Sequence, residues 1–233
     1  MDKRWQQLGD LLINYATEVR PGERVMIAMS EVQTLPLAEA VYAAAIRTGA
    51  YPQVQFLSET LRHSLLKYGS AEQLAWVPEI EAYGMEWADV YIGLRGAYNL
   101  HIHSQIPAEK LSLNQGAMGK VSTLRWEQTR WSVIRVPNAA FAFQAEMDEE
   151  AVEDMFFNAC LLDWEMESRR WRGWARTLGQ ASTVRVVGKE TDLRFSVQGR
   201  TWIVGDGKFN MPDGEIHTAP ITSTIDGQIY FEE

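Results

Sequence analysis

Residues 25–57 read VMIAMSEVQTLPLAEAVYAAAIRTGAYPQVQFL and determine the architecture of the N-terminal part of the chain. Residues 25–29 form a short continuous apolar run, which is typical of a strand buried on both faces. Residues 35–48 are rich in alanine and predict a helix that ends at Gly49. Residues 51–57 predict the next strand. A strand, a helix and a strand at this spacing predict a right-handed crossover, the building block of a parallel sheet.

The same alternation continues less regularly up to about residue 180. Apolar runs and helical periodicity predict strands at residues 90–94 and 131–136, and helices at residues 4–19, 59–68, 71–83, 108–128 and 148–178, the last being one or two helices. We therefore predict an α/β fold with an open, mostly parallel sheet and flanking helices. The basic, tryptophan-rich residues 169–174 are flanked by acidic side chains, which favours a solvated amphipathic helix over a nucleic-acid surface.

The character of the sequence changes after residue 180. Short β-rich runs separated by glycine turns occupy residues 184–187, 193–197, 201–204 and 225–231. We therefore predict a domain boundary near Gln180. Residues 1–180 would form the α/β N-terminal domain, and residues 181–233 a short antiparallel β-rich segment without an evident closing element.

Composition excludes several classes of protein. A net charge of −9 over 233 residues argues against nucleic-acid binding, which needs a basic surface. The sequence contains no apolar run of about eighteen residues, so we expect no membrane span. The single cysteine, Cys160, lies in an apolar helical stretch and is expected to be buried and inert. With no disulfide possible within the chain, we expect a cytoplasmic protein.

The N-terminal part contains further candidate sites, formed by histidines and by the ends of the predicted strands. In a strand, His101 and His103 would share one face and could chelate a metal, but they fall in a predicted loop with no third ligand nearby. His63 is expected on the exposed side of a helix. The carboxyl ends of the sheet predict a crevice around residues 30–31 and 95–96, and the acidic Glu31 there disfavours a bound phosphate.

Residues 210–220 read NMPDGEIHTAP and carry the clearest candidate for chemistry. Proline and glycine on both sides of Glu215 restrict the backbone, so this segment can present one carboxylate rigidly. A metal ion benefits from ligands that are fixed before it binds. The alternative interpretation is a plain surface turn, because Pro-Asp-Gly is common in turns.

The same segment resembles the Asn-x-Pro-x-Gly-Glu-Val-Phe-Thr-Ala-Pro signature of the thermophilic aminopeptidase family of metallopeptidases. Residues 188–197 resemble the Gly-x-x-Thr-Asp-Leu-x-Phe-x-Val piece of that family, and residues 199–202, 206–210 and 226–229 follow in the same order and spacing. The resemblance therefore extends over about residues 183–230. One departure is His217, where the family usually carries an aromatic residue, and which could pack, bind substrate or touch metal.

The resemblance implies that Glu215 is a ligand to a pair of divalent metal ions (Zn, Co or Mn) that act on peptide substrates. It implies that residues 181–233 are the start of a metal-binding domain, with the remaining ligands C-terminal to the motif. It also implies a homodimer. From this we expect either a fragment of a larger aminopeptidase or a shortened relative, with no appreciable peptidase activity in the isolated chain.

The sequence is compatible with two other functions. The same fold family includes dioxygenases that cleave dihydroxypyridine rings with a single iron, and carboxylate and imidazole ligands serve iron as well. The other possibility is a non-catalytic module that has only a binding or dimerising role.

Overall fold

The computed structural model describes residues 2–232, which divide into two compact units. Unit 1 comprises residues 2–161 together with 208–212, and unit 2 comprises residues 162–207 together with 213–232. The domain boundary near Gln180 stays a prediction. The helix that precedes it, α9 (Trp164–Leu178), belongs to unit 2 in the structure.

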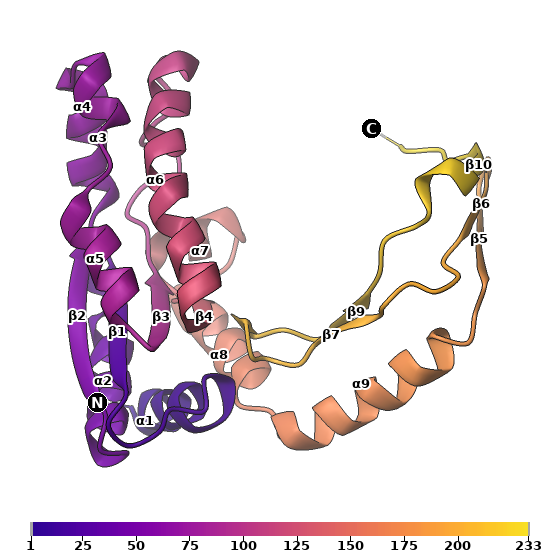
Figure 1. Ribbon diagram of the computed structural model, residues 1–233, viewed down its shortest axis with the longest axis horizontal. Coiled ribbons are helices and arrows are strands. Elements are labelled where there is room, and N and C mark those ends of the chain that lie inside the picture. Colours follow the sequence, from indigo (N-terminus) through magenta and orange to yellow (C-terminus); the bar gives the residue numbers. More distant parts are fainter. Residues whose placement is uncertain (1, 233) are drawn as a thin grey trace. The chain divides into compact units, whose positions relative to one another are not determined.

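The core of unit 1 is a five-stranded sheet in which every pair of neighbours is parallel (Figure 1). In the order β2-β1-β3-β4-β8, the strands are Tyr51–Leu57, Arg24–Ser30, Val90–Arg95, Arg130–Arg135 and Asn210–Met211. The first four strands occur where the apolar runs predict them. The predicted α/β class with an open parallel sheet is confirmed.

Strand β8 was not predicted, because its two residues were assigned to the turn segment that carries Glu215. It pairs with β4 through Val133↔Asn210 and Ile134↔Met211. Met211 is buried, and the ring of the preceding Phe209 packs 5.1 Å from that of Trp131 between centroids. Residues 208–212 thus return to the sheet of unit 1 immediately before the candidate metal ligand.

Helices cover both faces of this sheet (Figure 1). Their bounds are α1 (Lys3–Leu11), η1 (Leu12–Ala16), η2 (Val32–Thr34), α2 (Leu35–Arg47), α3 (Glu59–Tyr68), α4 (Ala71–Ala75), α5 (Glu79–Trp87), α6 (Ala108–Gln128), α7 (Ala139–Gln144) and α8 (Glu149–Cys160). The prediction of a single helix over residues 71–83 was wrong, since α4 ends at Ala75 and α5 begins at Glu79. Pro78 caps α5 and disfavours helical backbone at the residue before it. None of the helices in residues 2–232 is both long and apolar enough to cross a membrane.

Alternate side chains of the strands face opposite sides of the sheet, and a core forms on each side. Met26 and Ala28 of β1 and Tyr91 of β3 pack against α5 and α6, while Val25 and Ile27, which are fully buried, face the other side. On that other side α1 packs closely on α2, because Gly9 lacks a side chain. A Cβ atom at Gly9 would lie 2.7 Å from the backbone carbon of Ala40.

Unit 2 consists of α9 and short antiparallel strands. The strands β5 (Thr183–Gly188), β6 (Thr191–Ser196) and β10 (Asp226–Gln228) form one sheet in the order β10-β6-β5, and β7 (Ile203–Gly205) pairs with β9 (Glu215–His217). The turn η3 (Thr222–Thr224) precedes β10. The predicted antiparallel segment is confirmed, although the strands near residues 203 and 226 are shorter than expected.

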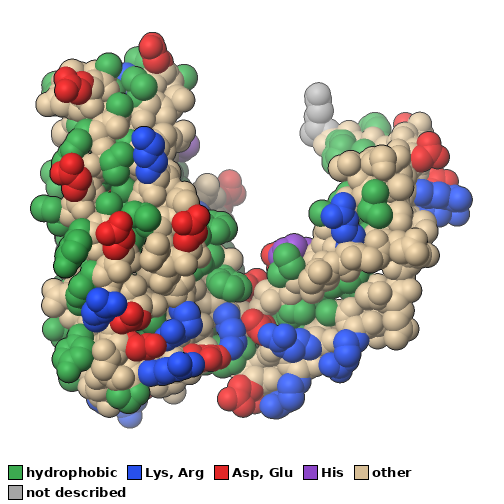
Figure 2. Space-filling model, in the orientation of Figure 1, with side chains coloured by type: hydrophobic (Ala, Val, Ile, Leu, Met, Phe, Trp, Pro, Cys, Tyr) green, Lys and Arg blue, Asp and Glu red, His purple; other side chains and the backbone are tan. Residues whose placement is uncertain are grey.

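Helix α9 carries the basic, tryptophan-rich stretch, and its basic side chains, all of them arginines, gather along it in Figure 2. Acidic side chains pair with two of these arginines. Arg170 lies 3.1 Å from Glu167, and Arg172 lies 2.6 Å from Asp206. On the apolar side Trp164 is buried, so the helix is amphipathic as predicted.

Candidate metal-binding segment

Glu215 and His217 lie on the same side of strand β9. In the antiparallel pair with β7, Glu215 is opposite Gly205 and His217 is opposite Ile203. Residues two apart in a strand project to one face, and the Nδ1 atom of His217 lies 3.1 Å from Oε1 of Glu215. Both side chains are largely exposed, at 49% for His217 and 66% for Glu215. The structure therefore brings together the two residues that the sequence singles out in this segment.

The turn before Glu215 is held by close contacts between the Asp213 carboxylate and the backbone of two glycines. The N–H of Gly214 donates to Oδ1 of Asp213 at 3.0 Å. Gly214 has a φ of +131°, and Gly205 leaves room for the Asp213 carboxylate, because a Cβ atom at Gly205 would lie 2.3 Å from Oδ1. These contacts fix the start of β9 and hence the backbone position from which the Glu215 side chain projects.

Two further carboxylates lie near this turn and were not proposed as site residues from the sequence. Asp206 is buried and accepts hydrogen bonds from Ser168 Oγ at 2.8 Å and from Arg172 Nη2 at 2.6 Å. Burial raises the pKa of Asp213 above its ordinary value, and the negative charges of Glu215 and Asp206 raise it further. The available signal was local: Asp213 belongs to the Pro-Asp-Gly turn, and Asp206 to the resembling residues 206–210.

The donor set at Glu215 suits a divalent cation. Its carboxylate oxygen and the neighbouring imidazole nitrogen are ligand types that zinc, cobalt and manganese accept. Two donors do not make a complete site, and within residues 2–232 no group of three or more His, Cys, Asp or Glu side chains is arranged to hold a metal ion. Glu215 fits the role of one ligand among several.

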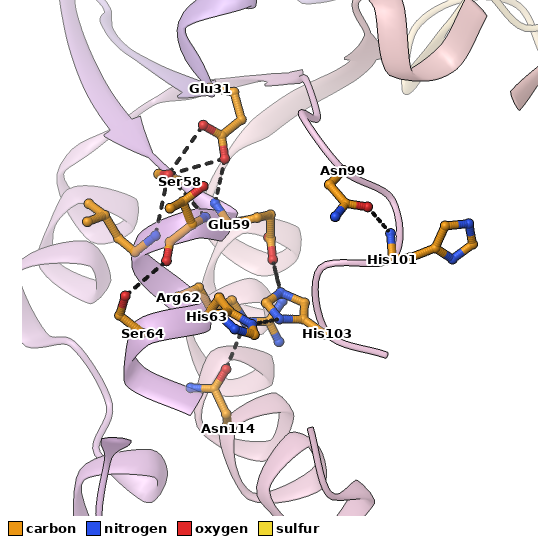
Figure 3. A network of polar contacts seen from close by, with 12 residues as sticks. Glu31, Ser58, Glu59, Arg62, His63, Ser64, Asn99, His101, His103 and Asn114 are labelled. Atoms are coloured by element: carbon orange, nitrogen blue, oxygen red, sulfur yellow. Dashed lines mark hydrogen bonds and ion pairs between the residues drawn. The ribbon is translucent and has the colours of Figure 1, made fainter. Parts of the chain in front are cut away.

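The histidines of unit 1 form a different arrangement, shown in Figure 3. Nε2 of His103 lies 2.7 Å from Oε2 of Glu59, and its Nδ1 lies 3.4 Å from Nδ1 of His63. The expectation that His63 marks an exposed helix face was wrong, because this contact partly buries it. The ring of His101 points away from His103 (Figure 3), so the two do not chelate together.

The carboxyl end of β1 is closely packed. Glu31 is 2% exposed and has a φ of +68°, and its carboxylate accepts from the Glu59 N–H at 2.7 Å and from Ser58 Oγ at 3.2 Å (Figure 3). A Cβ atom on Gly96 would lie 2.6 Å from the carbonyl oxygen of Ser30. Residues 30–31 and 95–96 are therefore closely packed, and the crevice predicted around them lies slightly further along the chain, as a cavity with Gln33 and Ala97 in its lining.

The model of the thermophilic metalloprotease family (M29) matches residues 1–233. The chain belongs to the M29 family. The resemblance predicted from residues 210–220 is confirmed.

Solved structures agree with the M29 fold. AmpT from Thermus thermophilus superposes with a TM-score of 0.82 at 20% sequence identity, covering 97% of this chain and 63% of that chain. This chain therefore spans less than two thirds of the length of AmpT. A 2,5-dihydroxypyridine dioxygenase from Pseudomonas putida gives a TM-score of 0.52 at 14% identity, covering 95% of this chain and 57% of that chain.

These structural matches show the fold alone, since both identities are low. The dioxygenase alternative is not favoured, because the family model that matches the whole chain is that of a metalloprotease. A comparison with curated protein sequences finds no match.

Proposed function

We propose that this M29 chain is the N-terminal part of a metal-dependent aminopeptidase, which releases N-terminal amino acids from peptides. One observation carries the proposal. The family match includes the motif around Glu215, whose side chain is exposed at the start of β9. Peptides are the substrates that membership in a protease family supports.

The proposed site uses two divalent metal ions (Zn, Co or Mn), with Glu215 as one ligand. Such ions supply Lewis acidity toward a peptide carbonyl. The role of the chain's own residues is positioning. The Pro-Asp-Gly turn fixes the backbone of Glu215, and His217, whose Nδ1 atom lies 3.1 Å from Oε1, forms an ion pair with the carboxylate when its imidazole is protonated.

We further propose that the remaining ligands come from outside these 233 residues, and that the isolated chain lacks appreciable peptidase activity. A single carboxylate does not position two cations. A homodimer and a cytoplasmic location complete the proposal. The cytoplasmic location rests on the absence of a possible disulfide, since Cys160 is the only cysteine.

The function is tested in the natural polypeptide that contains residues 1–233. We expect it to release the N-terminal residue of aminoacyl p-nitroanilides, to lose this activity in a chelator and to regain it with Zn²⁺, Co²⁺ or Mn²⁺. Glu215→Ala should lower the activity by about a hundredfold or more, as loss of a metal ligand does. The matched control is Glu165→Ala, an exposed glutamate of α9. Full activity in Glu215→Ala would overturn the assignment.

The 233-residue chain is assayed in parallel with the same substrates and metals. No turnover above the metal-only blank is the expected result. Turnover that Glu215→Ala abolishes would show that the chain supplies a complete site. Metal analysis of the natural polypeptide distinguishes the enzyme classes, because one iron per chain would support the dioxygenase instead.

A further inference from the structure

The turn that precedes Glu215 lies against helix α9, which packs on both strands of the β7–β9 pair (Figure 1). Trp171 of α9 faces the backbone of Gly214, since a Cβ atom on that glycine would lie 3.4 Å from Cζ2 and Cη2 of the indole ring. Gly214 also has a φ of +131°, a conformation that residues with a side chain rarely adopt. The residue immediately before Glu215 is therefore held next to an aromatic ring from a different element.

A second contact joins α9 to the strand opposite Glu215. Gly205 pairs with Glu215 across the two strands, and the next residue, Asp206, is buried. Oδ2 of Asp206 accepts from Ser168 Oγ at 2.8 Å and from Arg172 Nη2 at 2.6 Å, while Nε of Arg172 donates to Ser168 Oγ at 3.0 Å. The three side chains form a closed set of hydrogen bonds, and the charges of the arginine and the aspartate strengthen it.

The side chains that make these contacts share one face of α9. Residues 164, 168 and 171 are spaced by four and three positions, which places them on one side of a helix. The ring of Trp164 meets that of Trp171 edge to face, 5.9 Å away between centroids. A Cβ atom on Gly207, whose φ is +79°, would lie 2.8 Å from Cε3 of Trp164. This face of α9 therefore holds residues 206–207, at the end of β7, and residue 214, at the start of β9.

Glu215 itself makes few contacts, so the direction of its carboxylate depends on its backbone. The side chain is 66% exposed, and the ion pair with His217 lies on the same strand. A ligand that is fixed before the cation arrives loses less conformational entropy when it binds. Groups that hold a ligand in place without touching the metal contribute about 10- to 100-fold to metal affinity.

We propose that Trp171 and the Arg172–Asp206 pair are positioning residues for Glu215, and that they hold the backbone on both strands so that the carboxylate is in place when a divalent cation binds. The inference rests on the proposed function, in which Glu215 is a metal ligand. All of these residues belong to unit 2, and α9 acts on the site without contributing a ligand from Trp171 or Arg172.

The test is the Co²⁺ affinity of the natural polypeptide that contains residues 1–233, measured by competition with a chromophoric chelator and without substrate. Trp171→Ala should lower this affinity by about tenfold or more. Trp171→Phe, which keeps an aromatic ring opposite Gly214, should restore most of it. The visible absorption bands of bound Co²⁺ should change in Trp171→Ala, because they report the coordination geometry. The matched control is Trp174→Ala, a half-exposed tryptophan of the same helix, which should leave both readouts unchanged.

A second variant tests the contact on the opposite strand. Arg172→Gln removes the charged partner of Asp206 and should also lower Co²⁺ affinity, by about tenfold. Arg176→Ala, an exposed arginine of α9, is its control. Circular dichroism shows whether each variant is folded at the temperature of the titration. If Trp171→Ala does not fold, Arg172→Gln decides alone. Wild-type Co²⁺ affinity and absorption in the folded variants, even with a lower melting temperature, would overturn the proposal.

The Glu215→Ala variant separates this inference from the proposed function. Weakened Co²⁺ binding in both Glu215→Ala and Trp171→Ala, with Trp174→Ala unaffected, supports the positioning role. Weakened binding in Glu215→Ala together with wild-type binding in Trp171→Ala and Arg172→Gln would overturn the positioning role alone. Unchanged binding in Glu215→Ala would overturn the assignment of the metal ligand, and this inference with it.

Discussion

The Nδ1 atom of His217 lies 3.1 Å from the Oε1 atom of Glu215, across one side of strand β9. The carboxylate that we propose as a metal ligand therefore has an imidazole neighbour on its own strand.

This contact makes the role of His217 measurable. In the natural polypeptide, His217→Ala should lower metal affinity by about 10- to 100-fold, the usual effect of removing a group that orients a ligand. Metal content after dialysis against a competing chelator provides the measurement. Unchanged metal affinity with a raised KM would indicate that His217 contacts substrate. No change in either quantity would leave the imidazole without a role at this site.

Asp213 should make the stability of unit 2 depend on pH. Its pKa is raised by burial and by the neighbouring carboxylates, so the folded state binds the proton more tightly than the unfolded chain does. The ionised form therefore lowers stability at pH values above the folded pKa, and this penalty disappears below the ordinary value of 3.8.

Asp213→Asn removes this penalty. We expect the variant to have a higher free energy of unfolding than the wild type at about pH 7, and the difference to vanish at about pH 3. Urea unfolding at both pH values tests this, with Asp226→Asn as an exposed control in the same unit. A less stable variant at neutral pH would mean that the N–H···carboxylate bond from Gly214 outweighs the charge repulsion.

His103 should hold the loop between β3 and α6. It contacts both Glu59 and His63 of α3, whereas His101 in the same loop points away (Figure 3). Removing these contacts by His103→Ala should lower the free energy of loop opening by about 1 kcal/mol. Amide hydrogen exchange of residues 99–106 should then rise about fivefold. His101→Ala is the matched control, and equal exchange in the two variants would rule out this role.

Cys160 should be inert in the folded protein. It is fully buried, and burial raises its pKa from 9.0 to about 12, which lowers the thiolate fraction at neutral pH by about a thousandfold. Ellman's reagent should react only after urea unfolds the chain. Prompt reaction of the native protein would show that unit 1 opens around α8.

The sequence alone predicts the part of the fold that rests on continuous patterns. The apolar runs at residues 25–29 and 90–94 mark strands that are buried on both faces, and they occur as β1 and β3. Strand β8 could not be found in this way, because two residues carry no periodicity. Its strand character comes from pairing with β4, which lies about 75 residues earlier in the chain.

The candidate site, too, can be predicted from the sequence only in part. The motif identifies Glu215 because its spacing to proline and glycine is local. The contact between His63 and His103 joins residues 40 positions apart and depends on how α3 meets the following loop. The raised pKa of Asp213 likewise depends on burial and on Asp206, neither of which is visible in a linear pattern.

The return of residues 208–212 to the sheet has a practical consequence for dissecting this protein. A polypeptide that ends at Leu161 would keep β4 but lose its outer neighbour β8 and the side chain of Met211. The N–H of Val133, which donates to the carbonyl oxygen of Phe209, would then be open to pairing with other molecules, and exposed strand edges promote aggregation. Residues 1–161 expressed alone should therefore self-associate and aggregate.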